Sequence, residues 1–153
     1  MTITARVLAK DVVTASPEET VAAVAQRMAG SKVGSIALLD SSRKLAGIFT
    51  ERDLLSKVVG KGLDPAKTKV LSVMTSNPAT VQADEPLEKV FAAFSEAAYR
   101  HLPIMEGDKL IGIASLHDFA QVLVRLGQDE QAMETFAEGA LSSPRQVIRV
   151  RGQ

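Results

Sequence analysis

The stretch "GIFTERD" (residues 47–53) has a near copy, "GIASLHD" (residues 112–118), 65 positions further along the chain. Each copy reads Gly, Ile, one apolar residue, a hydroxyl residue, two spacers and Asp. A short apolar run is typical of a strand, and a hydroxyl residue three positions before an acidic one is typical of a helix start. The stretch therefore predicts a strand that passes directly into a helix, and it predicts this junction twice.

The similarity includes a helix that precedes each junction. The spacing of one helix face is followed in both halves, by Val21, Val24, Ala25 and Met28 and, 66 positions later, by Leu87, Val90, Phe91 and Phe94. In front of the first helix, Ser16 is expected to be the N-cap, Pro17 the first helical residue and Glu19 the partner in a capping box. Asp84 is the expected cap of the second helix.

Strands and second helices also match. "SIALL" (35–39) aligns with "HLPIM" (101–105), and "LAGIFT" aligns with "LIGIAS" after a turn that is one residue longer in the first half, which changes the spacing from 66 to 65. One apolar face is expected on each second helix. Its residues are Leu54, Leu55, Val58 and Val59 within 53–59 in the first half, and Phe119, Val122, Leu123 and Leu126 in the second.

Each half therefore reads strand, helix, strand, turn, strand, helix, which predicts an α+β fold. We expect a first repeat at 7–62, a second repeat at 70–127 and a C-terminal tail at 128–153. The tail begins with a predicted helix and ends in the basic segment "PRQVIRVRGQ". Because a unit of roughly 60 residues buries too little surface to be more than marginally stable alone, the two repeats are expected to pack face to face. Only 4% of residues are aromatic, so the core must be aliphatic.

The composition narrows the function classes. Eighteen basic residues balance eighteen acidic ones, so there is no excess charge with which to attract nucleic acid or an anionic membrane. The absence of cysteine excludes disulfides, thiolate metal sites and a cysteine nucleophile. The N-terminal residues lack the apolar segment of a signal peptide, and no apolar run approaches the ~18 residues of a membrane span. We therefore expect a cytoplasmic protein that binds neither nucleic acid nor membrane.

Together these features resemble a tandem pair of CBS domains, also called a Bateman module. The resemblance covers about residues 7–126 and rests on the repeated element order, both Gly-Ile stretches, "VMTSNPATV" (73–81) and "YRHLPIM" (99–105). It implies two β-α-β-β-α repeats related by a pseudo-twofold axis, with two clefts between them. Such modules usually bind adenine nucleotides in these clefts and pair into a disc of four repeats, so the resemblance also implies a homodimer.

Two interpretations exist for the Asp that ends each stretch. Thr50 with Asp53, and Ser115 with Asp118, match a capping box, in which the hydroxyl caps the helix and the acid reaches back to the chain. In CBS modules the hydroxyl residue and the Asp of this motif hydrogen-bond the ribose of a nucleotide, and the resemblance implies that role for all four residues. A carboxylate offers two acceptor oxygens to two vicinal hydroxyl donors. The two roles are compatible, because the hydroxyl can cap while the carboxylate binds ribose.

By the same resemblance, the adenine slot is lined by the entry strand and the second strand of each repeat. The residues concerned are Val12, Val13, Ile36 and Ala37 in the first repeat and Pro78, Ala79, Leu102 and Pro103 in the second. For each of them, an ordinary place in the hydrophobic core is the competing interpretation.

Cations for the phosphates are expected near the same elements. The candidates are Arg52, Arg100, His101 and His117. Two of them are adjacent at the strand entry of the second repeat, whereas the first repeat has Gly34 and Ser35 there, which makes the clefts unequal. Arg52 is a strong phosphate ligand because it is always charged and forked, although a solvated surface role is its rival. A neutral structural role is the rival for His101 and His117.

Common enzyme signatures are missing: the sequence has no Gly-x-Ser-x-Gly elbow, no P-loop and no His pair at metal-ligand spacing. We therefore expect a non-catalytic regulatory module, without a metal or a catalytic cofactor. Its expected ligand is AMP, with ADP, ATP, NAD(H) and S-adenosyl compounds as alternatives, and it passes energy or redox state to an unknown partner in trans. The competing interpretation is a ligand-free dimerising scaffold. The presence of a hydroxyl residue and an Asp in both repeats favours binding.

Overall fold

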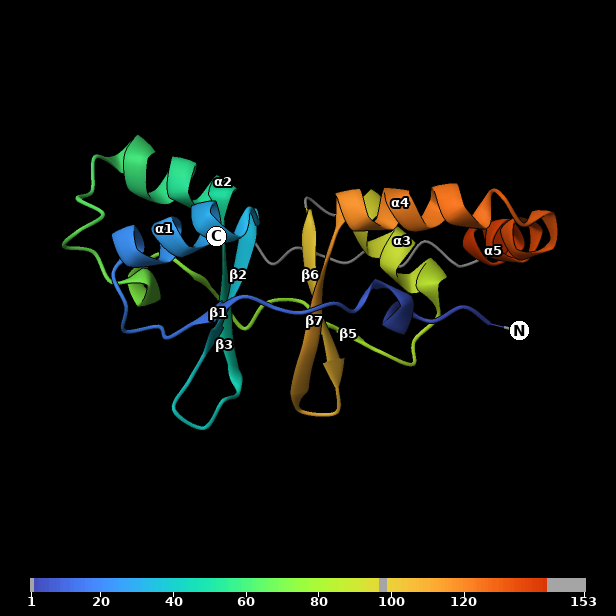
Figure 1. The fold of residues 1–153 in the computed structure, drawn as a ribbon, viewed down its shortest axis with the longest axis horizontal. Helices are drawn as coiled ribbons and strands as arrows, with labels where there is room; N and C mark the ends of the chain where they lie inside the picture. Colours follow the sequence, from blue (N-terminus) through green and yellow to red (C-terminus); the bar gives the residue numbers. More distant parts are fainter. Residues whose placement is uncertain (1, 97–98, 143–153) are drawn as a thin grey trace. The chain divides into compact units, whose positions relative to one another are not determined.

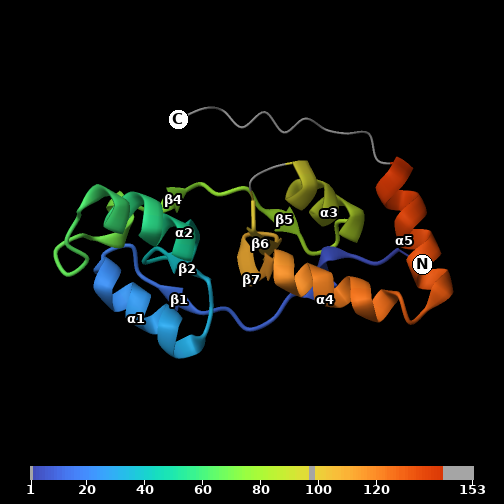
Figure 2. The ribbon, with the colours of Figure 1, turned by 90° about the horizontal axis from the view of Figure 1, so that it is seen from above.

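The structure is a computed structural model, and it describes residues 2–96 and 99–142. The chain divides into two compact units. The first unit comprises residues 11–79 and 108–110, and the second unit comprises the remaining described residues. Each unit holds one small sheet and the helices that pack on it (Figures 1 and 2).

The first unit contains a four-stranded mixed sheet in the order β1-β2-β3-β4. Strand β1 is parallel to β2, and the other pairs are antiparallel. The strands are β1 (Thr14–Ala15), β2 (Ser35–Leu39), β3 (Leu45–Thr50) and β4 (Thr75–Ser76). The helices are α1 (Val21–Ser31) and α2 (Glu51–Asp53), which continues as a π-helix (Leu54–Val58) and a 3-10 turn (Val59–Lys61), and a 3-10 helix η4 (Val70–Ser72).

The second unit repeats this order in a three-stranded sheet, β5-β6-β7. Its elements are the 3-10 helix η1 (Ala5–Leu8), β5 (Val81–Gln82), α3 (Leu87–Glu96), β6 (His101–Glu106), β7 (Lys109–Ser115), α4 (Leu116–Leu126) and α5 (Glu130–Ser142). The register repeats too, because Ala15 pairs with Leu38 in the first sheet and Val81 pairs with Ile104, 66 positions later, in the second. The predicted α+β class with two β-α-β-β-α repeats is confirmed.

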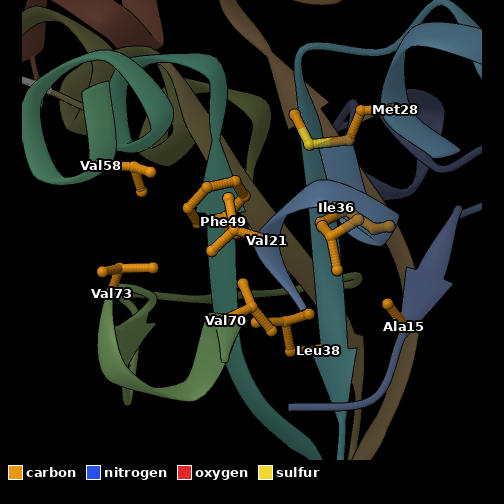
Figure 3. Packing of buried hydrophobic residues seen from close by; sticks show 10 residues of the cluster. Ala15, Val21, Met28, Ile36, Leu38, Phe49, Val58, Val70 and Val73 are labelled. Carbon is orange, nitrogen blue, oxygen red and sulfur yellow. The ribbon is translucent and has the colours of Figure 1, made fainter. Parts of the chain in front are cut away.

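The core of the first unit forms where one face of its sheet meets α1 and the helical segment 51–61. Figure 3 shows Phe49 within this cluster, with Val21 and Val58 beside it, and all three side chains are fully buried. The prediction that Leu55 and Val59 share this face is wrong, since they are 66% and 61% exposed. Residues four apart form one stripe on a helix. Only the stripe that contains Val58 faces the core.

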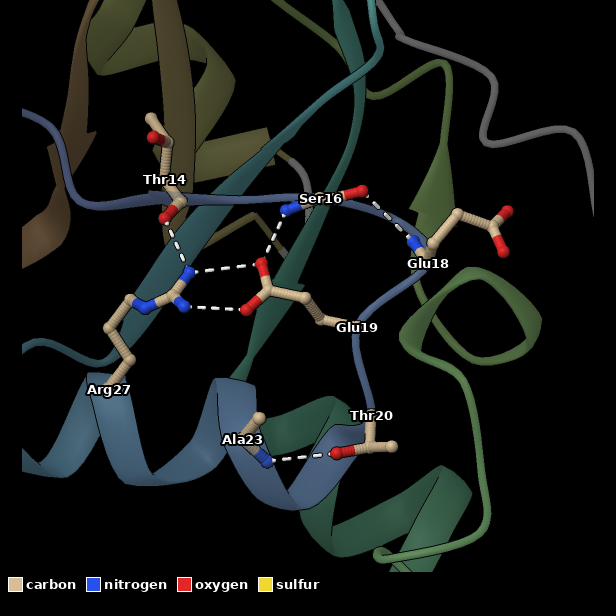
Figure 4. Close-up of polar contacts among 7 residues, drawn as sticks. All are labelled: Thr14, Ser16, Glu18, Glu19, Thr20, Ala23 and Arg27. Carbon is tan, nitrogen blue, oxygen red and sulfur yellow. Dashed lines mark hydrogen bonds and ion pairs between the residues drawn. The ribbon is translucent and has the colours of Figure 1, made fainter.

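The start of α1 also differs from the prediction. The helix begins at Val21, and its N-cap is Thr20, whose side chain accepts a hydrogen bond from the Ala23 N–H. Ser16 and Glu19 do form a reciprocal pair, in which the Ser16 N–H donates to Glu19 Oε2 at 2.7 Å and the Glu19 N–H donates to the Ser16 carbonyl at 3.1 Å, but this pair closes a turn before the helix. Figure 4 shows why the turn is stable: Arg27 donates through both terminal nitrogens to Glu19 and also to the Thr14 carbonyl.

The second unit has the same turn. Helix α3 begins at Leu87, so Asp84 lies in the preceding turn and is not the cap that was predicted. Glu85, the counterpart of Glu19, accepts from the Gln82 N–H at 2.9 Å and is paired with Lys89. In both repeats a capping pattern therefore marks a turn that comes before the helix.

Helix α5 covers an aromatic cluster in the second unit. The predicted tail helix is confirmed, and its Phe136 lies 6.0 Å from Phe91 and 6.2 Å from Phe119 between ring centroids. Figure 2 shows α5 at the end of α3 and α4 that is remote from β6 and β7. The basic segment "PRQVIRVRGQ" lies outside the described residues. Phe136 is 7% exposed, so α5 is held to the second unit by buried apolar contact.

A segment of seven residues completes each unit, and it was not recognised in the sequence. Residues 4–10 lie against the second repeat, where Arg6 N donates to the Ala83 carbonyl. Residues 69–75 lie against the first repeat, where Leu71 N donates to the Pro17 carbonyl. Positions 6 and 71 differ by 65 and positions 83 and 17 differ by 66, the spacings of the repeat itself. We call these two stretches the entry segments.

Candidate functional site

Asp118 and Ser115 stand at the junction between β7 and α4. The Ser115 Oγ accepts from the Asp118 N–H at 3.0 Å, and Asp118 Oδ2 accepts from both the N–H and the hydroxyl of Ser115, at 3.1 and 2.7 Å. This is a complete capping box, as predicted. It holds the carboxylate in one orientation and uses both lone pairs of Oδ2.

Asp53 and Thr50 form the same arrangement between β3 and α2. Asp53 Oδ2 accepts from the Thr50 N–H at 3.0 Å and from its hydroxyl at 3.2 Å, and Thr50 Oγ1 accepts from the Asp53 N–H at 3.2 Å. Asp53 is one of only two buried polar or charged residues among the described residues, with 8% of its surface exposed. The two repeats therefore present the same carboxylate in the same local geometry.

A lysine engages the outer oxygen of each carboxylate. Lys10 Nζ donates to Asp118 Oδ1 at 2.6 Å, and Lys57 Nζ lies 2.9 Å from Asp53 Oδ1. Lys10 belongs to an entry segment, whereas Lys57 lies one helical turn after Asp53. Lys57 Nζ also lies 3.5 Å from the hydroxyl of Thr75, the residue that corresponds to Lys10 in the other entry segment. Neither lysine was singled out in the sequence.

The electrostatic environment of Asp118 favours its charged form. Burial raises the pKa of Asp118, but the hydrogen bonds from Lys10 and Ser115 lower it by more, so that the pKa lies below the usual aspartate value. The side chain of Asp118 is 15% exposed and that of Lys10 is 59% exposed. Asp118 is thus an oriented and mostly buried carboxylate whose counter-ion is largely exposed to solvent.

The glycine of each Gly-Ile stretch lets an entry segment approach the site. A Cβ at Gly112 would lie 2.9 Å from Ala9 Cα and 3.2 Å from Lys10 N. A Cβ at Gly47 would lie 2.7 Å from both the Met74 sulfur and the Thr75 carbonyl oxygen. No side chain fits at either position without moving backbone. The glycine and the Asp of the stretch therefore act together, since the glycine brings Lys10 or Thr75 close to the carboxylate.

The predicted adenine-binding residues occupy two kinds of environment. Ile36 is part of the buried cluster of the first unit, and Val13 packs against it, which agrees with the competing core interpretation. Ala37 and Pro103 are buried as well, but they alternate with core residues along β2 and β6 and so lie on the opposite sheet face. Val12, Pro78 and Ala79 are half-buried, and Leu102 is buried.

The predicted phosphate-binding residues are mostly at the surface. Arg52, Arg100 and His117 are exposed, and His101 is half-buried. His117 shares a 3.0 Å contact with Gln121, one turn along α4. This contact fits the structural role that competes with phosphate binding.

Some of the N–H groups at the start of α2 and α4 already donate hydrogen bonds within the protein. The Glu51 N–H donates to the Gly34 carbonyl at 2.9 Å, and the Leu116 N–H donates to the Arg100 carbonyl at 3.0 Å. Since Thr50 and Ser115 take the N–H groups of Asp53 and Asp118, two donors of each first turn are already bonded. Phosphate binding at this junction would therefore depend on side-chain cations more than the sequence suggested.

The chain belongs to the CBS domain family, whose model matches residues 5–60 and 70–125. It is 34% identical over 131 residues to the uncharacterized protein MK0525 of Methanopyrus kandleri, covering 84% of this chain and 67% of that protein. It also matches CBS domain-containing proteins of Arabidopsis thaliana, of whose length it spans only 19% to 22%.

Solved structures agree with the fold. The crystal structure of the CBS domain NE2398 superposes with a TM-score of 0.75 at 29% identity, covering 81% of this chain and 99% of that one. The CBS domain protein PAE2072 from Pyrobaculum aerophilum, complexed with AMP, superposes with a TM-score of 0.73 at 21% identity, covering 89% and 99%. Within residues 2–96 and 99–142, no helix combines the length and the apolar character that crossing a bilayer requires.

Proposed function

We propose that this chain is a non-catalytic regulatory module that binds an adenosine nucleotide, AMP in the first place, and passes its state to a partner protein in trans. The observation that carries the proposal is the fixed carboxylate at the strand-to-helix junction of both repeats. Ribose is expected at Asp53 and Asp118, with Thr50 and Ser115 beside them. The AMP complex of PAE2072 supports the choice of ligand class.

The hydrogen-bonding capacity of each carboxylate refines this proposal. Both lone pairs of Oδ2 are used by the capping box, and one lone pair of Oδ1 faces a lysine. One acceptor position per Asp is therefore free for a ribose hydroxyl. A second ribose hydroxyl would have to replace the lysine. We expect ligand binding to rearrange the ion pair and to leave the capping box intact.

A ligand-free scaffold is the second candidate function, and one observation favours it. Every Asp53 and Asp118 oxygen already has a partner within the protein, so neither carboxylate requires a ligand for its stability. On this alternative the repeated stretch serves only to cap helices and to seat the entry segments. Both candidate functions assume a homodimer. Apolar surface for such a contact is offered by three exposed residues, Leu55, Val59 and, on α4, Val124.

Calorimetric titration tests the proposed function. Purified protein is titrated with AMP, ADP, ATP and NAD, and its mass is measured under native conditions to detect a ligand carried through purification. Saturable binding of at least one nucleotide supports the proposal. Absence of binding to all four, with no bound ligand in the native mass, would favour the scaffold.

A further inference from the structure

The two lysines contact equivalent oxygens of Asp118 and Asp53, but they come from different elements of their repeats. The counterpart of Lys10 in the other entry segment is Thr75, and the counterpart of Lys57 on α4 is Val122. Each repeat nevertheless has one ammonium at the outer oxygen of its Asp, and Lys57 Nζ is within 3.5 Å of Thr75 Oγ1. The position of the charge is thus shared by the repeats although the residue that supplies it is not.

Stability gives little reason for this convergence. Lys10 is 59% exposed and Lys57 is 40% exposed, and ion pairs with a solvent-exposed partner contribute about 0–1 kcal/mol. The carboxylates are already oriented by their capping boxes. An ammonium that is held weakly, next to a carboxylate that is held firmly, is suited to moving when another anion arrives.

We propose that Lys10 and Lys57 are phosphate-binding residues that make the sites selective for nucleotides over nucleosides, an inference that rests on the proposed function. When both ribose hydroxyls donate to Oδ1 of the Asp, the ammonium turns from the carboxylate to the phosphate of the same ligand. The ammonium exchanges the carboxylate for the phosphate, and the carboxylate exchanges its ammonium for a neutral hydroxyl donor, so the phosphate takes over the cation that the Asp gives up. A nucleoside brings no phosphate to receive the ammonium, so its second ribose hydroxyl must compete with the lysine for Oδ1.

The exchange involves no backbone motion. A lysine side chain is a flexible four-carbon stem with three rotatable donors, and both lysines are open to solvent. The approach of Lys10 to Asp118 depends on Gly112, which admits residues 4–10, whereas Lys57 reaches Asp53 from the next helical turn. Lys10 therefore also makes occupancy of the second repeat sensitive to the seating of residues 4–10.

The test compares AMP with adenosine by calorimetry in three proteins. These are the wild type, the double variant Lys10→Met/Lys57→Met, and the control Lys61→Met/Lys89→Met. The control removes the same charge, and Lys89 is likewise paired with a glutamate that accepts from a backbone N–H. All three are melted without ligand to establish that they are folded.

In the wild type and the control, AMP should bind at least tenfold more tightly than adenosine. In the double variant, AMP should lose about five- to twentyfold in affinity, which is less than a buried hydrogen bond to a charged group because both lysines are exposed, and adenosine should bind as well as before or better. A double variant that keeps the wild-type preference would overturn the lysine role while leaving nucleotide binding standing. Absence of AMP binding to the wild type would overturn the proposed function and this inference together.

Discussion

Lys10 and Asp118 are 108 residues apart in the chain, yet Lys10 Nζ lies 2.6 Å from Asp118 Oδ1. The contact joins an N-terminal entry segment to the strand-to-helix junction of the second repeat. Gly112 permits it, because any side chain there would meet the backbone of Ala9 and Lys10. Within one seven-residue stretch, the glycine thus admits the entry segment and the Asp pairs with its lysine.

Removal of Lys10 should change the pH dependence of stability. Folding lowers the pKa of Asp118, so this group contributes stability above its unfolded pKa, about 3.9, and the contribution is lost as pH falls through the folded pKa. Lys10→Met should raise the folded pKa and reduce the loss of stability between pH 5 and pH 2. Urea unfolding across that range checks this, with Lys61→Met as control. Equal pH profiles for the two variants would contradict it.

Two Gly→Ala substitutions should have opposite effects. Gly112→Ala places a Cβ 2.9 Å from Ala9 Cα and should cost about 1–3 kcal/mol, together with faster hydrogen exchange at the Arg6 amide. Gly30, in α1, has no atom within 4 Å of an added Cβ, so Gly30→Ala should stabilise by about 0.5–1 kcal/mol. Urea unfolding gives both values. If Gly112→Ala is neutral, the entry segment does not depend on this glycine.

The turn before α1 should depend on Arg27. Hydrogen bonding from Arg27 lowers the pKa of Glu19, so Arg27→Met should raise the Glu19 pKa, which NMR titration measures. The loss of stability at pH 7 should be about 0.5–1 kcal/mol, because the Arg27 side chain is 39% exposed. Gln26→Met, at the neighbouring exposed position, is the control. An unchanged Glu19 titration would show that the bidentate pair does not form in solution.

Helix α5 should detach when its aromatic anchor is removed. Phe136→Ala deletes a nearly buried ring that contacts Phe91 and Phe119 and should cost about 3 kcal/mol. Hydrogen exchange should accelerate throughout 130–142 and remain slow in α1. Leu141, which is 88% exposed, provides the matched control, and Leu141→Ala should change neither quantity. Slow exchange in α5 of the Phe136 variant would contradict this account.

Much of the fold was predictable because its signals are local. The strands "SIALL" and "LAGIFT" correspond to β2 and β3 residue for residue, and both predicted capping boxes at Thr50 and Ser115 are present. Apolar alternation and a hydroxyl cap depend on neighbours within a few residues, which one sequence displays.

The sequence-based predictions failed where contacts between residues far apart in the chain determine the local structure. Ser16 and Glu19 have the pattern of a helix start, but the chain from Ser16 to Glu19 forms a turn. The N–H of Val21, at the actual helix start, donates to the distant Thr68 carbonyl. Lys10 gave no signal, because nothing near it in the sequence indicates a partner 108 residues away. At the repeat spacing, residues 4–10 and 69–75 share no identical residue and match only in apolar character at three positions, so little in the sequence indicates the entry segments.

Titration of Asp118→Ala and of Glu85→Ala with AMP shows whether the carboxylate of the Gly-Ile stretch holds ribose. Both carboxylates accept from a backbone N–H and pair with a lysine, so both variants should melt at lower temperature than the wild type. If Asp118 holds ribose, Asp118→Ala should lose about 10- to 100-fold in affinity, the value of a hydrogen bond to a charged group, and Glu85→Ala should bind within about twofold of the wild type. If Asp118→Ala binds AMP as the wild type does and only melts lower, its carboxylate is a helix cap and nothing more.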